Sequence, residues 1–247
     1  MRIAVVTPYC REEPRVVARC IKTVKEQTVP CEHYLVGDGR AIRGMEADPT
    51  LRHMVLPFAH NDGGNVARTV GGLAAAAAGC DAIAYLDADN GYLPNHLESL
   101  RDLALTSGWP LIVSWRSFHR PDGTRLNVHS NEERRFGHVD TSCWLITRAA
   151  FDMLDAWLMP PPLGPVCDRV FLETARFRKH TIVSTRQRTV CYTTLYRNHY
   201  EILKEEPPEN AKSGGVEEAR TWLTLPENQA ATIEALGFCP TLRGPQS

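Results

Sequence analysis

The sequence predicts an α/β fold in which a mostly parallel central sheet carries helices on both faces. Short apolar, largely β-branched runs alternate with segments whose apolar residues recur every three to four positions, as in βαβ units. The chain has 247 residues, 43% of them hydrophobic, which is enough for one large core. Polar or acidic residues follow several of the apolar runs, a placement typical of α/β proteins that bind ligands at one sheet edge.

The first half of the chain shows this alternation most clearly. Ile3–Thr7 is almost entirely apolar and β-branched, which predicts a strand buried on both faces. Pro14 suits the first turn of a helix that ends near Gln27. The other elements expected up to residue 110 are strands at 33–36, 54–56 and 83–86 and helices at 66–78 and 95–105.

The second half is less regular. A long polar loop over 116–140 is expected between strands at 111–115 and 143–147, and a helix is expected at 167–179. Residues 182–184 and 190–194 resemble two short strands. The composition changes after Tyr200, so we expect a main domain over 1–205, with halves at 1–110 and 111–205, and a C-terminal helical extension over 206–247.

Charge and targeting features narrow the class of protein. With 28 Lys and Arg against 29 Asp and Glu, the net charge of −1 argues against binding nucleic acid by bulk electrostatics. The sequence shows no signal peptide, and no apolar window approaches the roughly 18 residues of a membrane span. Its eight cysteines are scattered without a CxxC pair, which favours reduced thiols. We therefore expect a cytoplasmic protein without a transmembrane segment.

Acidic residues follow the predicted strands at the expected ligand edge. Asp38 comes after the second strand, and Asp87 and Asp89 come directly after the strand at 83–86. Two carboxylates this close repel each other unless a positive group lies beside them. A divalent cation such as Mg²⁺ or Mn²⁺, held by carboxylates and phosphate oxygens, would supply that charge. A solvated acidic turn is the alternative.

These motifs occur in an order that resembles the family 2 glycosyltransferases, whose fold is the single, Rossmann-like GT-A domain of nucleotide-diphospho-sugar transferases. The resemblance covers about residues 1–200 and rests on IAVVTPYC, YLVGDG and GNVARTVGG, followed by IAYLDADN with its DxD motif. Two departures are specific: Gly37-Asp38-Gly39 has one Asp where the family often has two, and Thr69 stands where Asn usually follows the arginine.

The resemblance implies that residues 1–110 bind the nucleotide-sugar donor. The implied contacts with base, ribose and diphosphate are Thr7, Pro8, Tyr9, Arg11, Asp38, Arg68, Asp87, Ala88 and Asp89. Arg68 either approaches the diphosphate or braces the acidic residues. Asp89 would bind the metal, with His199 as a further ligand. For His199 a surface or core position is the alternative, and Arg197 could reach phosphate instead.

The resemblance also implies a catalytic base in the acceptor-binding half, residues 111–205. Asp168 stands where the family carries this base, although Cys167 replaces the usual acidic neighbour. Asp168 is also suited to cap the helix that begins near Arg169, and both roles can hold together. Asp140 is the rival, because it precedes a strand expected beside the acceptor and could contact donor sugar or acceptor.

The implied activity is transfer of a sugar from a nucleotide-diphosphate donor to a hydroxyl of a saccharide, a lipid-linked acceptor or a small molecule. We expect a metal-dependent, inverting enzyme of the hexosyltransferase type. A sugar-phosphate nucleotidyltransferase is one alternative, although its glycine-rich loop is replaced here by TPYCREEP. A non-catalytic nucleotide-sugar-binding protein is the other. The basic residues over 176–188 leave open a peripheral position on the inner membrane face.

Overall fold

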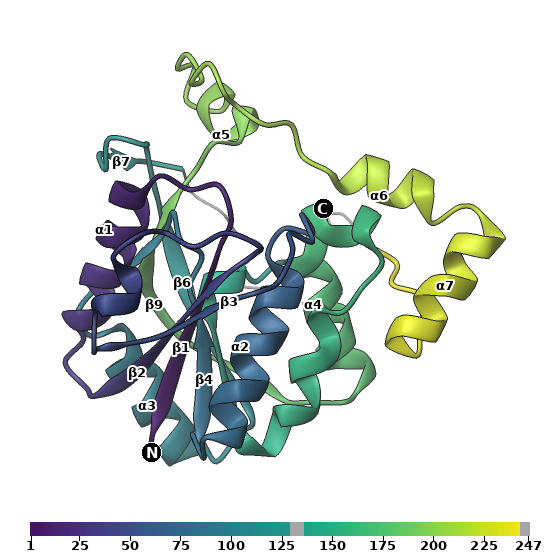
Figure 1. Ribbon diagram of the computed structural model, residues 1–247. Helices are drawn as coiled ribbons and strands as arrows, with labels where there is room; N and C mark the ends of the chain where they lie inside the picture. Colours follow the sequence, from purple (N-terminus) through teal and green to yellow (C-terminus); the bar gives the residue numbers. More distant parts are fainter. Residues whose placement is uncertain (129–135, 243–247) are drawn as a thin grey trace.

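The computed structural model describes residues 1–128 and 136–242, and within them one sheet of nine strands organises the chain (Figure 1). The strands run in the spatial order β3-β2-β1-β4-β8-β6-β9-β5, and β7 pairs with the edge of β6. Their bounds are β1 Ile3–Tyr9, β2 Cys31–Gly37, β3 Leu51–Val55, β4 Ala82–Tyr85, β5 Gly91–Tyr92, β6 Leu111–His119, β7 Arg125–Leu126, β8 Trp144–Thr147 and β9 Ile182–Thr193.

The sheet is mostly parallel, as the sequence predicts. Strands β1 to β4 pair in parallel, and β9 pairs in parallel with β6. Three strands run the other way: β8 lies antiparallel between β4 and β6, and the two-residue strands β5 and β7 pair antiparallel with β9 and β6. Because β6 is antiparallel to β8, it regains the direction of β4, so the main strands end at a common edge.

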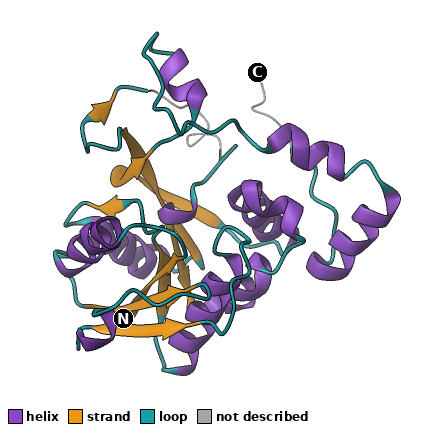
Figure 2. Cartoon of the chain, turned by 45° about the horizontal axis from the view of Figure 1, so that its top comes forward, coloured by secondary structure: helices purple, strands orange, loops and turns teal. Residues whose placement is uncertain are grey.

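Helices cover both faces of the sheet (Figure 2). The α-helices are α1 Pro14–Lys25, α2 Asn65–Ala77, α3 His96–Ser107, α4 Cys167–Phe177, α5 Arg197–Glu201, α6 Val216–Trp222 and α7 Pro226–Leu236. Shorter 3₁₀ segments are η1 Met45–Ala47, η3 Thr141–Cys143, η4 Arg148–Trp157 and η5 Pro161–Val166. In Figure 1, α6 and α7 form an arm beside α4, away from the strands. None of the helices in 1–128 and 136–242 is both long and apolar enough to cross a bilayer.

The predicted elements recur with small shifts. Pro14 occupies the first turn of α1, whose buried face is Val17, Cys20, Ile21 and Val24. The two short strands expected at 182–184 and 190–194 are one strand, β9, with register shifts against β6 at the bulge around Trp115. The expected loop over 116–140 begins later, because β6 continues to His119 and β7 follows, while its residues 129–135 lie outside the described part.

The arm contributes to the same core as the sheet. Ala219, Leu223 and Leu236 are buried in one continuous apolar cluster with residues of β1 and β4. The tail beyond residue 242 lies outside the described part. The division at residue 205 remains a prediction.

A cluster of aromatic side chains forms the part of the core next to Arg68, which lines the ligand edge of the sheet. The Trp157 and Phe171 rings stack with centroids 4.1 Å apart, and Tyr85 meets Trp157 edge to face at 5.2 Å. Trp144 also packs edge to face on Phe171. All four rings are fully buried, and because Phe171 belongs to α4 they pack that helix against the sheet.

Helix α2 packs on the sheet at a glycine. A β-carbon built on Gly71 would lie 2.5 Å from Cγ1 of Val6 and 3.0 Å from Cγ2 of Val36. We expect Gly71→Ala to lower the free energy of unfolding by about 1–3 kcal/mol, the usual cost of overpacking. That cost exceeds the roughly 1 kcal/mol by which alanine favours a helix. Urea denaturation measures the change.

Gly214→Ala is the matched control, because no atom lies within 4 Å of its built β-carbon. Its stability should stay within about 0.5 kcal/mol of the wild type. A Gly71→Ala variant as stable as the wild type would show that α2 does not depend on this close approach.

Candidate functional site

A cavity of about 520 Å³ opens at the carboxyl ends of β1, β2 and β4, where the sequence predicts a ligand site. Strand ends, the turn before α2, the start of α4 and the segment after β9 form its walls. The predicted site residues that line it are Pro8, Tyr9, Arg11, Asp38, Arg68, Asp87, Ala88, Asp89, Asp140 and Asp168. The fold therefore brings ten of the predicted residues, from six parts of the chain, to one cavity.

Arg68 braces the acidic turn after β4. Its guanidinium, 4% exposed as a residue, donates to Oδ1 of Asp87 over 2.6 Å and to the carbonyl of Gly63 over 2.9 Å. It also lies over the Trp157 ring, 5.2 Å from its centroid. Of the two roles predicted for Arg68, the structure favours the brace, because the guanidinium is held on Asp87.

Asp89 has a different environment from Asp87. Burial, and then the neighbouring carboxylates of Asp87 and Glu12, raises the pKa of Asp89 to about 7. Its backbone carbonyl accepts from Arg19 over 3.0 Å and from the Thr193 hydroxyl over 2.7 Å, which fixes the turn. A half-buried carboxylate with this excess of negative charge around it fits a cation ligand.

Asp38 is fully engaged by the loop that follows β3. Its two oxygens accept from the His60 backbone N–H, the His60 ring and the Asn61 backbone N–H over 2.8–3.1 Å. Burial alone would raise the pKa of Asp38, but these hydrogen bonds outweigh it and lower the pKa. Asp38 thus shapes the cavity through residues 60 and 61 while lining it itself, and its contact with a nucleotide base stays a prediction.

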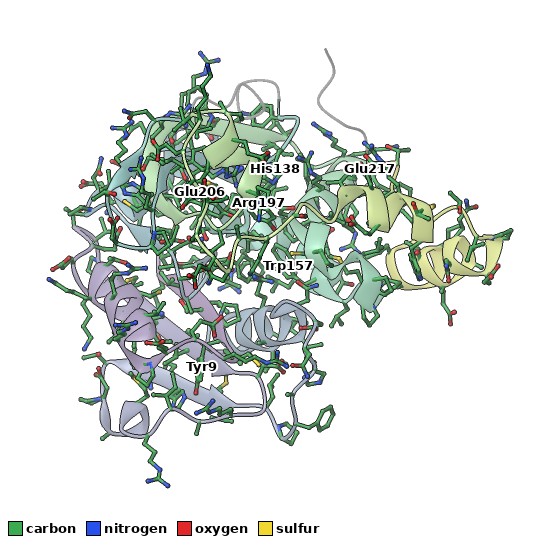
Figure 3. All side chains as sticks on the ribbon, turned by 90° about the horizontal axis from the view of Figure 1, so that it is seen from above. Tyr9, His138, Trp157, Arg197, Glu206 and Glu217 are labelled. Atoms are coloured by element: carbon green, nitrogen blue, oxygen red, sulfur yellow. The ribbon has the colours of Figure 1, made fainter. Side chains whose placement is uncertain are left out.

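The residues at the end of β1 divide between cavity and interior. The Thr7 prediction is wrong in this respect: the residue is fully buried, and its hydroxyl bonds the His33 ring over 2.9 Å. Tyr9 lines the cavity, and its hydroxyl is held by the His53 ring at 2.7 Å. Arg11 donates to the Asn61 side chain over 2.9 Å. Figure 3 shows Tyr9 on the side of the N-terminal strands, well separated from His138.

Asp168 lies across the cavity from the donor-side strands, in the first turn of α4. The expected cap is corrected, because the helix begins at Cys167 and Val166 is the capping residue. One Asp168 oxygen accepts from the Arg169 backbone N–H over 2.7 Å, and the other from Nε2 of His138. Burial alone would raise the pKa of Asp168, but His138, Arg116 and Arg169 lower it to about 2.

Asp140 is a structural carboxylate in this arrangement. Its Oδ1 accepts from the Ser142 backbone N–H over 3.0 Å and caps η3, and its Oδ2 accepts from Arg116 over 2.6 Å. Burial raises its pKa, against the opposing effect of Arg116. The Asp140 side chain is only 6% exposed and is paired with Arg116, whereas the Asp168 side chain is 21% exposed, so Asp168 is the more accessible of the two carboxylates to an acceptor.

His199 and Arg197 do not line the cavity, although the sequence places them as candidate metal and phosphate ligands. Nδ1 of His199 bonds the Thr194 hydroxyl over 2.7 Å, and its ring packs on Phe118 at 4.6 Å. Across residues 1–128 and 136–242 no group of three or more His, Cys, Asp or Glu side chains forms a metal site. A metal at Asp89 would therefore take its remaining ligands from a bound molecule and water.

Several residues that line the cavity carry no signal in the sequence. Lys212 is the clearest, since it comes from the arm side and its backbone pairs with Leu195 and Arg197. Tyr192 and Tyr196 come from the end of β9 and the residues after it. The surrounding sequence of Lys212, NAKSGG, has no periodicity that could have signalled this position.

Comparison with known proteins places the fold. No protein-family model and no curated protein matches the sequence. The class of fold is nevertheless shown by solved structures that superpose on most of the chain, which confirms the predicted GT-A fold class.

The structures in question are of TarS from S. aureus. TarS 1–349 in complex with UDP-GlcNAc has a TM-score of 0.63 and 15% identity, over 96% of this chain and 80% of that one. TarS 1–349 in complex with UDP has a TM-score of 0.62 and 15% identity, over 83% of this chain and 64% of that one. This chain thus spans just under two thirds of the latter, and identity this low supports the fold alone.

The environment of Asp168 makes a pH prediction. Its folded pKa of about 2 lies below its ordinary value of 3.8, so the carboxylate stabilises the fold at every pH above about 4. That contribution, about 2 kcal/mol, should disappear as the pH falls through about 2. Asp168→Asn should lack it, so the unfolding free energies of wild type and variant should converge as the pH falls from about 4 to about 2.

Urea denaturation at several pH values measures both proteins. Asp122→Asn, in an exposed turn away from the cavity, is the comparison for an exposed carboxylate: hydrogen bonds from Thr124 lower the pKa of Asp122, so its effect should have the same sign and be smaller. A constant difference between wild type and Asp168→Asn across this pH range would contradict the assigned environment.

Proposed function

We propose that this protein is a glycosyltransferase that moves a sugar from a nucleotide-diphosphate donor to a hydroxyl acceptor. The observation that carries the proposal is the pairing of Asp89 and Asp168 across one cavity, at the ligand edge of a GT-A fold. Asp89 has the character of a cation ligand, and Asp168 stays ionised at neutral pH. TarS, with the same fold, binds UDP-GlcNAc, a nucleotide sugar.

The donor side supplies the groups that a diphosphate needs. Asp89 would hold a divalent cation, Mn²⁺ or Mg²⁺, which when bound neutralises charge on the departing diphosphate. Lys212 adds a positive side chain to the same cavity, and Asp89 feels its charge. The positive charge of Arg68 balances the negative charge of Asp87. The charge of a bound cation would therefore be balanced mainly by Asp89.

Asp168 would act as the catalytic base. The acceptor oxygen forms a bond to the anomeric carbon from the face opposite the diphosphate, and the bond from that carbon to the diphosphate oxygen breaks with inversion. The hydroxyl proton passes to Asp168. A carboxylate with a pKa of about 2 is a weak base, so this transfer is favourable only once the acceptor oxygen has gained positive charge by bonding.

The loop after β1 argues against a nucleotidyltransferase. The Glu12 carboxylate accepts from the backbone N–H groups of Cys10 and Arg11 over 2.7 and 3.1 Å. These are the donors that a loop in this position would offer to a triphosphate. Because the Glu12 carboxylate already occupies these N–H groups, the loop is ill suited to bind a triphosphate, which is more negative.

A cytoplasmic location and the acceptor class remain predictions from the sequence.

Asp89→Ala tests the donor site. We expect it to abolish metal-dependent binding of the nucleotide sugar, because the carboxylate that holds the cation is gone, while the fold persists. Thermal shift with UDP-, GDP-, CDP- and dTDP-sugars, each with Mn²⁺ or with EDTA, measures binding through its stabilisation of the folded state. Asp122→Asn again serves as the control, and full donor binding by wild type in EDTA would overturn the metal assignment.

Asp168→Asn tests the base. The variant should bind the donor as the wild type does and lose about 10²–10⁴-fold in turnover, the usual contribution of a positioned base. Release of nucleoside diphosphate in the presence of a hydroxyl acceptor measures turnover. Near-normal turnover in Asp168→Asn would exclude it as the base. A wild type that binds nucleotide sugars without releasing diphosphate would instead support a non-catalytic binding protein.

A further inference from the structure

His138 lies directly behind Asp168, outside the cavity. It is 7% exposed and does not line the site, yet its Nε2 donates to the Asp168 oxygen that Arg169 does not bond. It comes from the segment before η3, about 30 residues before Asp168 in the sequence. The two residues therefore meet only because the fold brings this segment against the start of α4.

The partner on the other side of the ring fixes its tautomer. Nη2 of Arg116 lies 3.0 Å from Nδ1 of His138. A guanidinium can only donate, so Nδ1 must accept and carries no proton. The ring proton of neutral His138 then lies on Nε2, where it points at Asp168. The ring consequently serves as a hydrogen-bond donor to the carboxylate.

Arg116 itself has little freedom. It is 6% exposed, its Nη1 pairs with Asp140 over 2.6 Å, and its guanidinium lies 5.0 and 4.7 Å from the ring centroids of Phe118 and Tyr192. Packing between two aromatic rings and a buried carboxylate locks its orientation. The direction of the His138 ring is therefore set by a rigid group on β6.

The same chain of contacts continues to the donor side. Asp140 caps η3 through the Ser142 backbone N–H. The Ser142 hydroxyl accepts from the Asp87 backbone N–H over 3.2 Å and from the Asn90 side chain over 3.1 Å. Asp168 is thus connected to the acidic turn after β4 by successive hydrogen bonds, which fixes the two sides of the cavity relative to each other.

We propose that His138, held by Arg116, is a positioning residue that orients the Asp168 carboxylate toward the acceptor hydroxyl. This inference rests on the proposed glycosyl transfer. The Nε2–H bond occupies one carboxylate oxygen and stops rotation of the group, so the remaining lone pairs keep one direction. Orientation of a reacting group contributes through the geometry of attack and leaves donor binding unchanged.

Kinetics of two substitutions test the proposal. His138→Leu removes the hydrogen bond to Asp168 and should lower kcat by about 10²-fold, the scale of a small misplacement at a reacting centre. The KM for the nucleotide sugar should stay unchanged. His138→Gln places an amide N–H near the position of Nε2 and should recover most of the loss. Equal kcat in wild type and a folded His138→Leu would overturn the proposal, as would a His138→Gln that is as slow as His138→Leu.

His96→Leu is the matched control for loss of a buried histidine. His96 is fully buried and bonds the Thr189 hydroxyl over 2.8 Å, but it does not line the cavity. Its substitution should lower stability and leave kcat unchanged. A fall in kcat for His96→Leu as large as for His138→Leu would show that the effect is a general loss of packing, and would overturn the positioning role.

A measurement without activity separates this inference from the proposed function. Nitrogen NMR of histidine-labelled protein at neutral pH, with the signal identified from His138→Gln, should show His138 protonated on Nε2 and unprotonated on Nδ1. The opposite tautomer would overturn the inference even if every variant unfolded. If wild type has this tautomer but neither binds nor turns over any nucleotide sugar, the proposed function fails and the orientation of Asp168 stands.

Discussion

The ion pair between Arg68 and Asp87 is the interaction on which the site depends. Two carboxylates leave a buried strand one residue apart, and they cannot both stay ionised in this setting without a counter-charge. Arg68 supplies that charge to Asp87 and is itself seated on Trp157, part of the aromatic core. Asp89 remains as the carboxylate with negative neighbours and no fixed counter-ion within the described chain. The packing of Arg68 on the core therefore assigns Asp87 to a structural ion pair and leaves Asp89 as the carboxylate suited to a ligand.

The acceptor side repeats this arrangement with a second buried arginine. Arg116 pairs with Asp140 and supports His138, just as Arg68 pairs with Asp87. Arg68, Asp87 and Asp140 line the cavity together with Asp89 and Asp168, so both ion pairs form part of its wall. Removing either arginine would leave an uncompensated buried charge, which typically costs about 3–5 kcal/mol. The two arginines therefore couple the stability of the protein to the geometry of the proposed reaction.

Most of the fold and the acidic turn after β4 follow from the sequence, because a buried parallel strand has a characteristic pattern and its end marks the ligand edge. Side-chain direction is less predictable. Thr7 is buried because both faces of β1 are covered, and its hydroxyl bonds the His33 ring. The Asp38 carboxylate is hydrogen-bonded by residues 60 and 61. His138 and Lys212 reach the site region from segments with no regular pattern, so only the tertiary structure could identify them.

The use of Asp38 has a consequence for recognition. Its four contacts hold the turn at residues 60 and 61 in place before any ligand arrives. The turn loses its conformational entropy when the chain folds. The binding of a ligand against the turn therefore does not carry this entropic cost a second time. This wall of the cavity is therefore rigid before a ligand binds. Discrimination among nucleotides would depend more on how well the shape of the base fits this wall than on a side chain that reorients to form a hydrogen bond.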